Sequence, residues 1–298
     1  MSDTGAGLRH KIASAGDLRS VVRTMKAVAA ASIAQYERSV AALADYSLSV
    51  ELGLGVSLRQ VEGLSAPIGS QAATGIGIGS GGVGAIVFGS DQGLVGQFND
   101  AIADRAVTAL TTLPGPARVW AVGERVQARL ADAGVPIAGS FAVPASVSAI
   151  TALVAQILVE TDAPDMHRRG AGLYLFYNRP TVGAIYTPVS ERLLPLDASW
   201  RRTLMQRHWP THNLPEVLGP GTTTLAALIG EYLFIALFRA CAESLASENA
   251  SRLAAMQRAE KNIDELLESM NAAFYRLRQS SIDEELFDVV SGFEALSQ

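Results

Sequence analysis

Glycines at nucleotide-site spacing are the first feature of this sequence that could do chemistry. Residues 75–84 include six glycines, and the pattern G-x-G-x-x-G begins at both Gly77 and Gly79. A dinucleotide fingerprint needs a strand before the glycines and a helix after them, because the helix N-terminus binds the pyrophosphate. Here the glycines precede the apolar run AIVF, which is typical of a buried strand. We therefore interpret them as a flexible linker and expect no nucleotide cofactor.

A second glycine group does follow that strand. Gly89, Gly93 and Gly96 lie in GSDQGLVGQFND, at the carboxyl end of the strand, where α/β proteins usually bind ligands. A small-anion site is one interpretation. The loop contains no lysine or arginine, so we favour a tight structural turn.

Metal-binding and catalytic patterns are weak. His208 and His212 have ligand-like spacing, but Pro210 between them prevents the helical i, i+4 geometry, and no cysteine lies nearby. The consecutive acids at residues 283–285 point in different directions on a helix, which favours a solvated face. No Ser/His/Asp arrangement is recognisable. We expect no metal, no cofactor and no catalytic residue in this chain.

Composition and charge disfavour several classes of protein. The 298 residues carry a formal net charge of −5, which argues against a nucleic-acid binder. The single cysteine, Cys241, rules out an internal disulfide and lies in an apolar run, so we expect it to be buried. The opening MSDTGAGLRHK lacks an apolar leader, and the longest apolar runs are interrupted by charge or too short to span a bilayer. These features predict a cytoplasmic protein without a transmembrane segment.

Two proline-free segments predict long helices at the two ends of the chain. In the first, apolar or small residues recur at steps of three and four from Val22 to Leu54. The second, over residues 222–291, repeats this stepping with one gap. Such stepping is close to the repeat of a coiled-coil seam. The simplest way to bury both stripes is to pair them as an antiparallel, left-handed coiled coil.

Strands and helices alternate between these two segments. The strand-like runs are AIVFGSD, RVWAVG, GLYLFYNRP and GAIYTPVSERLLPL. This alternation predicts a Rossmann-like α/β domain with a mainly parallel sheet. The expected organisation is a coiled-coil shaft of residues 1–57 and 222–298, a Gly/Ser-rich linker of residues 58–84, an α/β domain of residues 85–209 and a Pro/Gly connector of residues 210–221.

A basic stripe runs along the first helix. Arg19, Arg23 and Lys26 are spaced four and three apart, so they share one helix face. Two interpretations stay open, a solvated face and a surface that meets an acidic partner.

Four short segments carry a family resemblance. They are VVRTMKAVAAAS near the N-terminus, SDQGLVGQFN after the first predicted strand, and ESLASENASRLAAM and RQSSIDEELFDVV in the C-terminal helix. In this order they resemble the gamma subunit of F-type rotary ATP synthases, the central shaft of the catalytic head. The matches cover both ends of the chain and the domain between them.

The resemblance implies partners. The paired helices would sit inside a ring of three alpha and three beta subunits, while the α/β domain would rest on the membrane c-ring with the epsilon subunit. The chain would be a peripheral, non-catalytic subunit at the cytoplasmic face of the bacterial inner membrane. It would act on ATP chemistry without binding ATP.

The resemblance also implies roles for individual residues. Those expected to contact the beta subunits are Arg23, Met25, Lys26, Arg278 and Gln279. Those expected to pack the shaft are Glu248, Arg252 and Met256. Those expected to shape the turn of the α/β domain are Asp91, Gly93 and Gly96.

The chain departs from the family pattern in places. Gln92, Val95 and Gln97 replace the usual turn residues, SIAQYERS is less basic than the usual continuation of the first helix, and the glycine-rich linker is atypical. These differences favour a divergent branch such as the alternative, sodium-type bacterial enzymes (N-ATPases). A coiled-coil scaffold unrelated to ATPases and an α/β nucleotide enzyme with helical arms are the competing interpretations.

Overall fold

The computed structural model describes residues 5–64, 83–113, 117–161, 172–182, 184–213 and 215–296. The chain divides into two compact units. One comprises residues 1–30 and 252–298, and the other comprises residues 31–251. Part of α1 (Gly5–Ala42) and part of α8 (Gly221–Leu296) belong to each unit.

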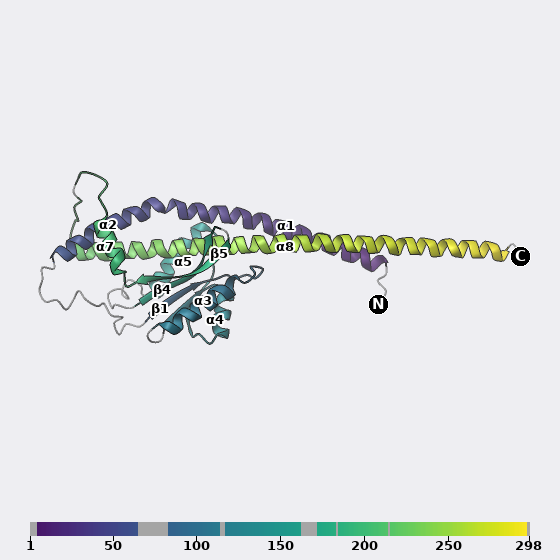
Figure 1. The fold of residues 1–298 in the computed structure, drawn as a ribbon, viewed down its shortest axis with the longest axis horizontal. Coiled ribbons are helices and arrows are strands. Elements are labelled where there is room, and N and C mark those ends of the chain that lie inside the picture. Colours follow the sequence, from purple (N-terminus) through teal and green to yellow (C-terminus); the bar gives the residue numbers. More distant parts are fainter. Residues whose placement is uncertain are drawn as a thin grey trace. The chain divides into compact units, whose positions relative to one another are not determined.

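The unit of residues 31–251 is built on a five-stranded sheet with the order β3-β2-β1-β4-β5. Figure 1 labels three of its strands, β1, β4 and β5. Strand β1 pairs in parallel with β2 and with β4, and β5 is antiparallel to β4. The strands are β1 (Val83–Phe88), β2 (Ala117–Val122), β3 (Ile137–Phe141), β4 (Gly172–Thr181) and β5 (Ala184–Leu194). The remaining helices are α2 (Ala44–Leu64), α3 (Phe98–Thr112), α4 (Glu124–Asp132), α5 (Val147–Glu160) and α7 (Ala198–Gln206).

Both faces of this sheet are covered, which is why β1 is apolar along its whole length. Ala85 and Val87 point into a core shared with α3 and α4. Ile86 and Phe88 alternate with them and point into the opposite core, which is completed by α5 and α8. Leu233 and Leu237 of α8 are fully buried in that second core.

The unit of residues 1–30 and 252–298 is a helix pair. Val22 of α1 packs with Met256 and Ile263 of α8. Contacts toward the start of α1 fall later in α8, since Arg23 meets Glu260 and Gly5 lies against Leu277. The pairing is therefore antiparallel, as predicted. The left hand of the coil stays a prediction.

The mainly parallel sheet between two long terminal helices confirms the predicted fold class. Cys241 is buried, also as predicted. Two elements of the sheet unit were missed, β3 and α7. Strand β3 is short and only its last residue, Phe141, is buried, so it lacks the continuous apolar run by which the other parallel strands are recognised.

The first helix differs from its prediction at two points. It is interrupted at Leu43, between α1 and α2, and it continues to Leu64 rather than ending at residue 57. The expected linker therefore begins too early. Residues after 57 stay helical because Leu58 is buried in the core and α2 packs on α7, where Gly55 approaches the Leu204 carbonyl too closely for any side chain. Most of the glycine pattern of residues 75–84 lies outside the described residues.

The buried seam of the helix pair sets its stability. Replacing Ile263, which is 7% exposed, with alanine removes apolar contacts and leaves a cavity, so we expect the pair to lose about 2–4 kcal/mol. The matched control is Leu266→Ala on the same helix, where the side chain is 53% exposed and the effect should stay within about 0.5 kcal/mol. Hydrogen exchange of the amides of residues 5–30 measures both, with the sheet amides as internal reference. Equal protection of these amides in the two variants would contradict the claim that the buried Ile263 side chain stabilises the helix pair.

Candidate functional site

The basic stripe of α1 meets acidic side chains of α8 within the helix pair. Arg23 Nε donates to Glu260 Oε1 over 2.8 Å, and Lys26 Nζ donates to the other oxygen of the same carboxylate over 2.5 Å. Arg19 pairs with Asp264 at 3.1 Å. Because Glu260 and Asp264 are four residues apart on α8, they present one acidic face to the stripe.

These ion pairs shift the titration of Glu260. The hydrogen bonds from Lys26 and then from Arg23 lower the pKa of its carboxyl. A lowered pKa means that the pairs stabilise the fold above the ordinary titration range of glutamate and cease to do so as the pH falls through the folded-state pKa. The Arg23 side chain is 57% exposed, so salt screens its pair and the contribution to stability is small.

The stripe therefore has a partner inside its own chain. Neither interpretation left open by the sequence, a solvated face or an acidic partner subunit, included this one. The Arg23 guanidinium nevertheless keeps much of its surface free for a second contact. Contact of Arg23 and Lys26 with beta subunits remains a proposal.

Beside the ion pairs, α1 carries an exposed apolar row. Leu18, Val21 and Val28 are each more than half exposed, and Met25, which packs against the core of the helix pair, continues their spacing. Met256 on α8 lies buried in that same core. Met25 thus lies at the border between the core and an apolar surface, whereas Met256 belongs to the core alone.

The other expected contact residues lie elsewhere on α8. Arg278 and Gln279 are exposed, and Arg278 lines a shallow hollow with Gly5, Arg9 and Phe274. The Arg9 guanidinium stacks over the Phe274 ring, 5.1 Å from its centroid. At 1.5 Å per residue, Arg278 is about 27 Å along the helix from Glu260. The predicted contact residues thus form two groups, not one cluster.

Glu248 and Arg252 occupy a closely packed part of α8. Glu248 is 5% exposed and lies in a run of small buried polar residues that includes Ser244 and Ser247. Arg252 is half-buried. Burial, followed by the nearby Glu248 charge, raises the pKa of the Cys241 thiol. This environment supports the packing role expected for both residues, which remains a prediction.

Asp91 joins three loops at the carboxyl end of the sheet. One of its carboxylate oxygens accepts the Glu124 N–H, in the first turn of α4, over 3.0 Å. The other accepts the Val143 N–H, after β3, over 2.9 Å. These two backbone N–H groups lie where the chain turns, so no helix or strand hydrogen bond satisfies them. Asp91 therefore acts as a structural acceptor that ties its turn to the start of α4 and to the segment after β3.

The rest of the turn is held from both sides. Ser90 N donates to Asn99 Oδ1 over 2.9 Å, and Asn99 Nδ2 returns a bond to Ser90 Oγ over 2.8 Å. Gly96 has a φ of 60°, which glycine adopts without strain. Gly93 meets only Arg125, at ordinary contact distance, so space does not require glycine there. The turn interpretation fits this geometry, and the individual roles of Asp91, Gly93 and Gly96 in a larger assembly stay predictions.

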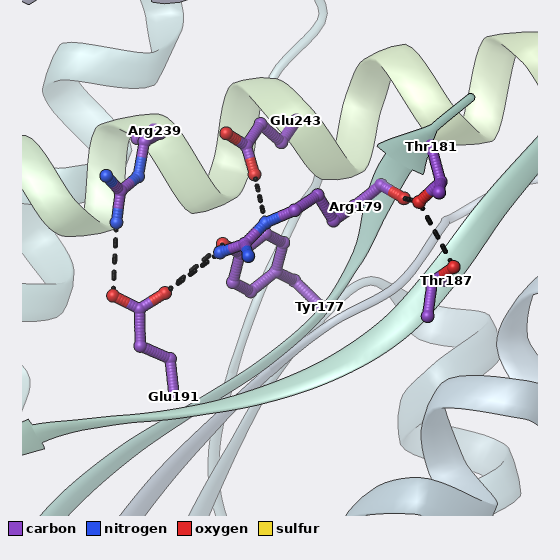
Figure 2. A network of polar contacts seen from close by, with 7 residues as sticks. All are labelled: Tyr177, Arg179, Thr181, Thr187, Glu191, Arg239 and Glu243. Atoms are coloured by element: carbon purple, nitrogen blue, oxygen red, sulfur yellow. Dashed lines mark hydrogen bonds and ion pairs between the residues drawn. The ribbon is translucent and has the colours of Figure 1, made fainter.

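A network of four charges joins the β4–β5 hairpin to α8 (Figure 2). Arg179 on β4 pairs with Glu191 on β5 at 3.2 Å and with Glu243 on α8 at 3.1 Å. Arg239, also on α8, pairs with the second oxygen of Glu191 at 3.1 Å. The Tyr177 phenol lies under the Arg179 guanidinium and donates to Glu191 Oε2 over 3.3 Å.

Sequence reasoning missed this network. Of the four residues, only Glu243 belongs to a segment that resembles the family. The sequence did contain a hint, since Arg239 and Glu243 are opposite charges four residues apart, in a helical segment that is otherwise mostly apolar. Arg179 and Glu191 are likewise charges inside strand-like runs. Nothing in the sequence indicated that the two strand charges would contact the two helix charges.

Metal and membrane patterns can be judged for the part of the chain that the structure describes. There, no group of three or more His, Cys, Asp or Glu side chains could hold a metal ion. Two helical stretches, Gly5–Val61 and Gly221–Phe293, are long and apolar enough to cross a membrane by length and composition alone. Length therefore does not exclude a span, contrary to the expectation from the sequence. Half of the most apolar part of the second is buried inside the protein, as in the core helix of a folded domain.

Comparisons with known proteins agree with this architecture. A family model described as ATP synthase matches residues 4–296. The ATP synthase gamma chain of Salinibacter ruber is 28% identical over 98% of this chain and 97% of its own length. That of Moorella thermoacetica is 26% identical over 97% and 98%.

Solved structures share the fold. A chain of the Euglena gracilis mitochondrial ATP synthase, in a structure of its OSCP/F1/c-ring, aligns with a TM-score of 0.59 at 15% identity, over 98% of this chain and 94% of that one. A chain of the Tetrahymena thermophila central stalk and c-ring aligns with a TM-score of 0.55 at 19% identity, over 80% and 99%. With the family model matched over nearly its whole length, the chain belongs to the ATP synthase family, among the gamma chains of F-type ATP synthases.

Proposed function

We propose that this chain is the rotating central shaft of a bacterial F-type ATP synthase and couples ion-driven rotation to conformational change in the catalytic beta subunits. The observation that carries this proposal is the family match over residues 4–296, which includes both long helices and the sheet between them. The chain contributes no catalytic residue of its own. Its part in ATP chemistry is mechanical.

The proposed mechanism is a population shift. A shaft whose faces differ is a ligand with different affinities for the open and closed conformations of beta. As it turns, each beta subunit in turn meets the face that favours binding, synthesis or release. A shaft with equal affinity for all conformations would shift none of them.

Exposed apolar side chains support contact with a surrounding ring. On α1 these are Leu18, Val21 and Val28, next to Met25. On the last turns of α8 they include Ile282, Leu286, Phe287, Val289, Val290 and Phe293. Apolar surface of this extent marks an interaction site. Arg23, Met25, Lys26, Arg278 and Gln279 are the proposed contacts with beta.

The sheet domain is the proposed contact with the membrane c-ring and the epsilon subunit. The chain would then be a peripheral subunit at the cytoplasmic face of the bacterial inner membrane, with no membrane span of its own. We retain the division into shaft, linker, α/β domain and connector as a working description, with the linker beginning after Leu64. The departures at Gln92, Val95 and Gln97 support a divergent, N-ATPase-like branch.

Partners provide the direct test. A tagged chain, purified from detergent-solubilised membranes of its native cells, should bring down alpha and beta subunits in stoichiometric amounts. Isolated chain should bind neither ATP nor NAD in equilibrium dialysis. Recovery of a partner-free monomer, or tight nucleotide binding, would instead favour a scaffold or a nucleotide enzyme.

The basic stripe allows a test that separates internal from external contacts. Arg23→Glu with Lys26→Glu places three acids together at Glu260, so like charges repel within the helix pair and coupling should fall. Adding Glu260→Lys restores the internal pairs with reversed sign. If the stripe also meets acidic side chains of beta, this triple variant should still be impaired. The number of ions it pumps per ATP hydrolysed should be roughly a third of the wild-type value or lower.

The measurements are ATP-driven ion pumping and ATP hydrolysis in inverted membrane vesicles. Hydrogen exchange of residues 5–30 checks that the triple variant has regained its helix pair. Full recovery of pumping in that variant would contradict the contact with beta. It would show that the stripe serves the helix pair alone.

A further inference from the structure

We propose that the four-charge network of Arg179, Glu191, Arg239 and Glu243 locks the register between the β4–β5 hairpin and α8, and that torque passes from the sheet domain into the shaft helix at this point. The inference rests on the proposed function. It assigns these four side chains a positioning role in rotary coupling.

The charges alternate around the contact. Arg239 and Glu243 lie one turn apart on the same face of α8 and are suitably spaced to pair with each other. Each instead reaches the hairpin, Arg239 to Glu191 and Glu243 to Arg179 (Figure 2). Arg179 and Glu191 are also paired with each other. Opposite charges therefore face each other at two successive turns of the helix.

This order makes a slide of α8 unfavourable in both directions. One turn of helix is about 5.4 Å. A one-turn slide one way brings Arg239 to the position of Glu243, opposite Arg179. A slide the other way brings Glu243 to the position of Arg239, opposite Glu191. Like charges meet in either case, which penalises the wrong register as well as favouring the right one.

Apolar burial alone favours one register over another less specifically than alternating charges do. The contact between the sheet and α8 is a core of buried side chains such as Leu233 and Leu237, with Ala236 and Ala240 on the same helix. Apolar burial is non-directional and depends mainly on area. It resists separation of helix and sheet more strongly than sliding. Ion pairs with fixed geometry supply the missing direction.

The two charges on the hairpin side of the network share a hydrogen-bond partner, the phenol of Tyr177. Tyr177 is fully buried, and burial raises the pKa of its phenol, so the hydroxyl keeps its proton. It accepts from Arg179 and donates to Glu191, which holds the two strand charges in place from below. Glu243 is only 16% exposed, so solvent screens its pair with Arg179 less than it screens a surface pair.

The test uses the assembled synthase in inverted membrane vesicles, with ion pumping and ATP hydrolysis measured at increasing opposing ion gradient. Arg179→Glu should leave hydrolysis without a gradient near wild type, because it touches no catalytic site. Under load, ions pumped per ATP should fall roughly threefold or more, the low end of coupling for interacting charges. The loss should grow with the gradient.

Two further variants separate register from general damage. The fourfold inversion Arg179→Glu, Glu191→Arg, Arg239→Glu and Glu243→Arg rebuilds the alternation with opposite signs and should restore pumping under load. Arg192→Glu is the matched control, since Arg192 lies next to Glu191 on β5, is similarly exposed and pairs with Asp197 instead of α8. It should pump as wild type does.

Wild-type pumping under load by Arg179→Glu would overturn the inference, as would a fourfold inversion that assembles and stays uncoupled. If Arg179→Glu does not assemble, Arg179→Gln removes the charge without repulsion, and wild-type pumping under load by that variant overturns it equally. The unaltered chain must copurify with the ring in the same preparation. That result tests the proposed function separately, so failure of one does not imply failure of the other.

Discussion

The apolar face of α8 is the constraint on which the rest of the structure depends. In one unit, Leu233 and Leu237 complete the core beneath the sheet, and in the other, Met256 and Ile263 complete the helix pair. Each of these cores would be open without that helix. A single element thus gives both units a face against which to fold, and ion pairs add polar contacts beside each of these apolar faces.

Much of this could be predicted from the sequence because burial leaves a periodic trace. The steps of three and four in the terminal helices and the apolar run of β1 were sufficient for the fold class. Strand β3, with alternating exposure, and α7 left weaker traces and were missed. Pro188 lies within β5 although proline has no N–H to donate to a neighbouring strand. It is tolerated there because β5 lies at the edge of the sheet.

The candidate site was less predictable, because its residues meet across long sequence separations. The stripe of Arg23 and Lys26 was visible, but its partner Glu260 lies more than 230 residues away and carries no local mark. Arg179 and Glu243 were each visible as charges in apolar surroundings, yet only the fold brings them together. Spacing within one element can be read from sequence, whereas complementarity between elements cannot.

The antiparallel helix pair has a consequence for how the chain is made. Arg19 and its partner Asp264 are separated by 245 positions, so the N-terminal helix emerges from the ribosome long before its partner exists. The sheet unit, which ends at Ser251, can fold first. Residues 5–30 must then keep an exposed apolar stripe in water until the last part of the chain is synthesised. The contacts that close the helix pair thus join segments far apart in sequence, and contacts of that kind form slowly because a long stretch of chain must first be ordered.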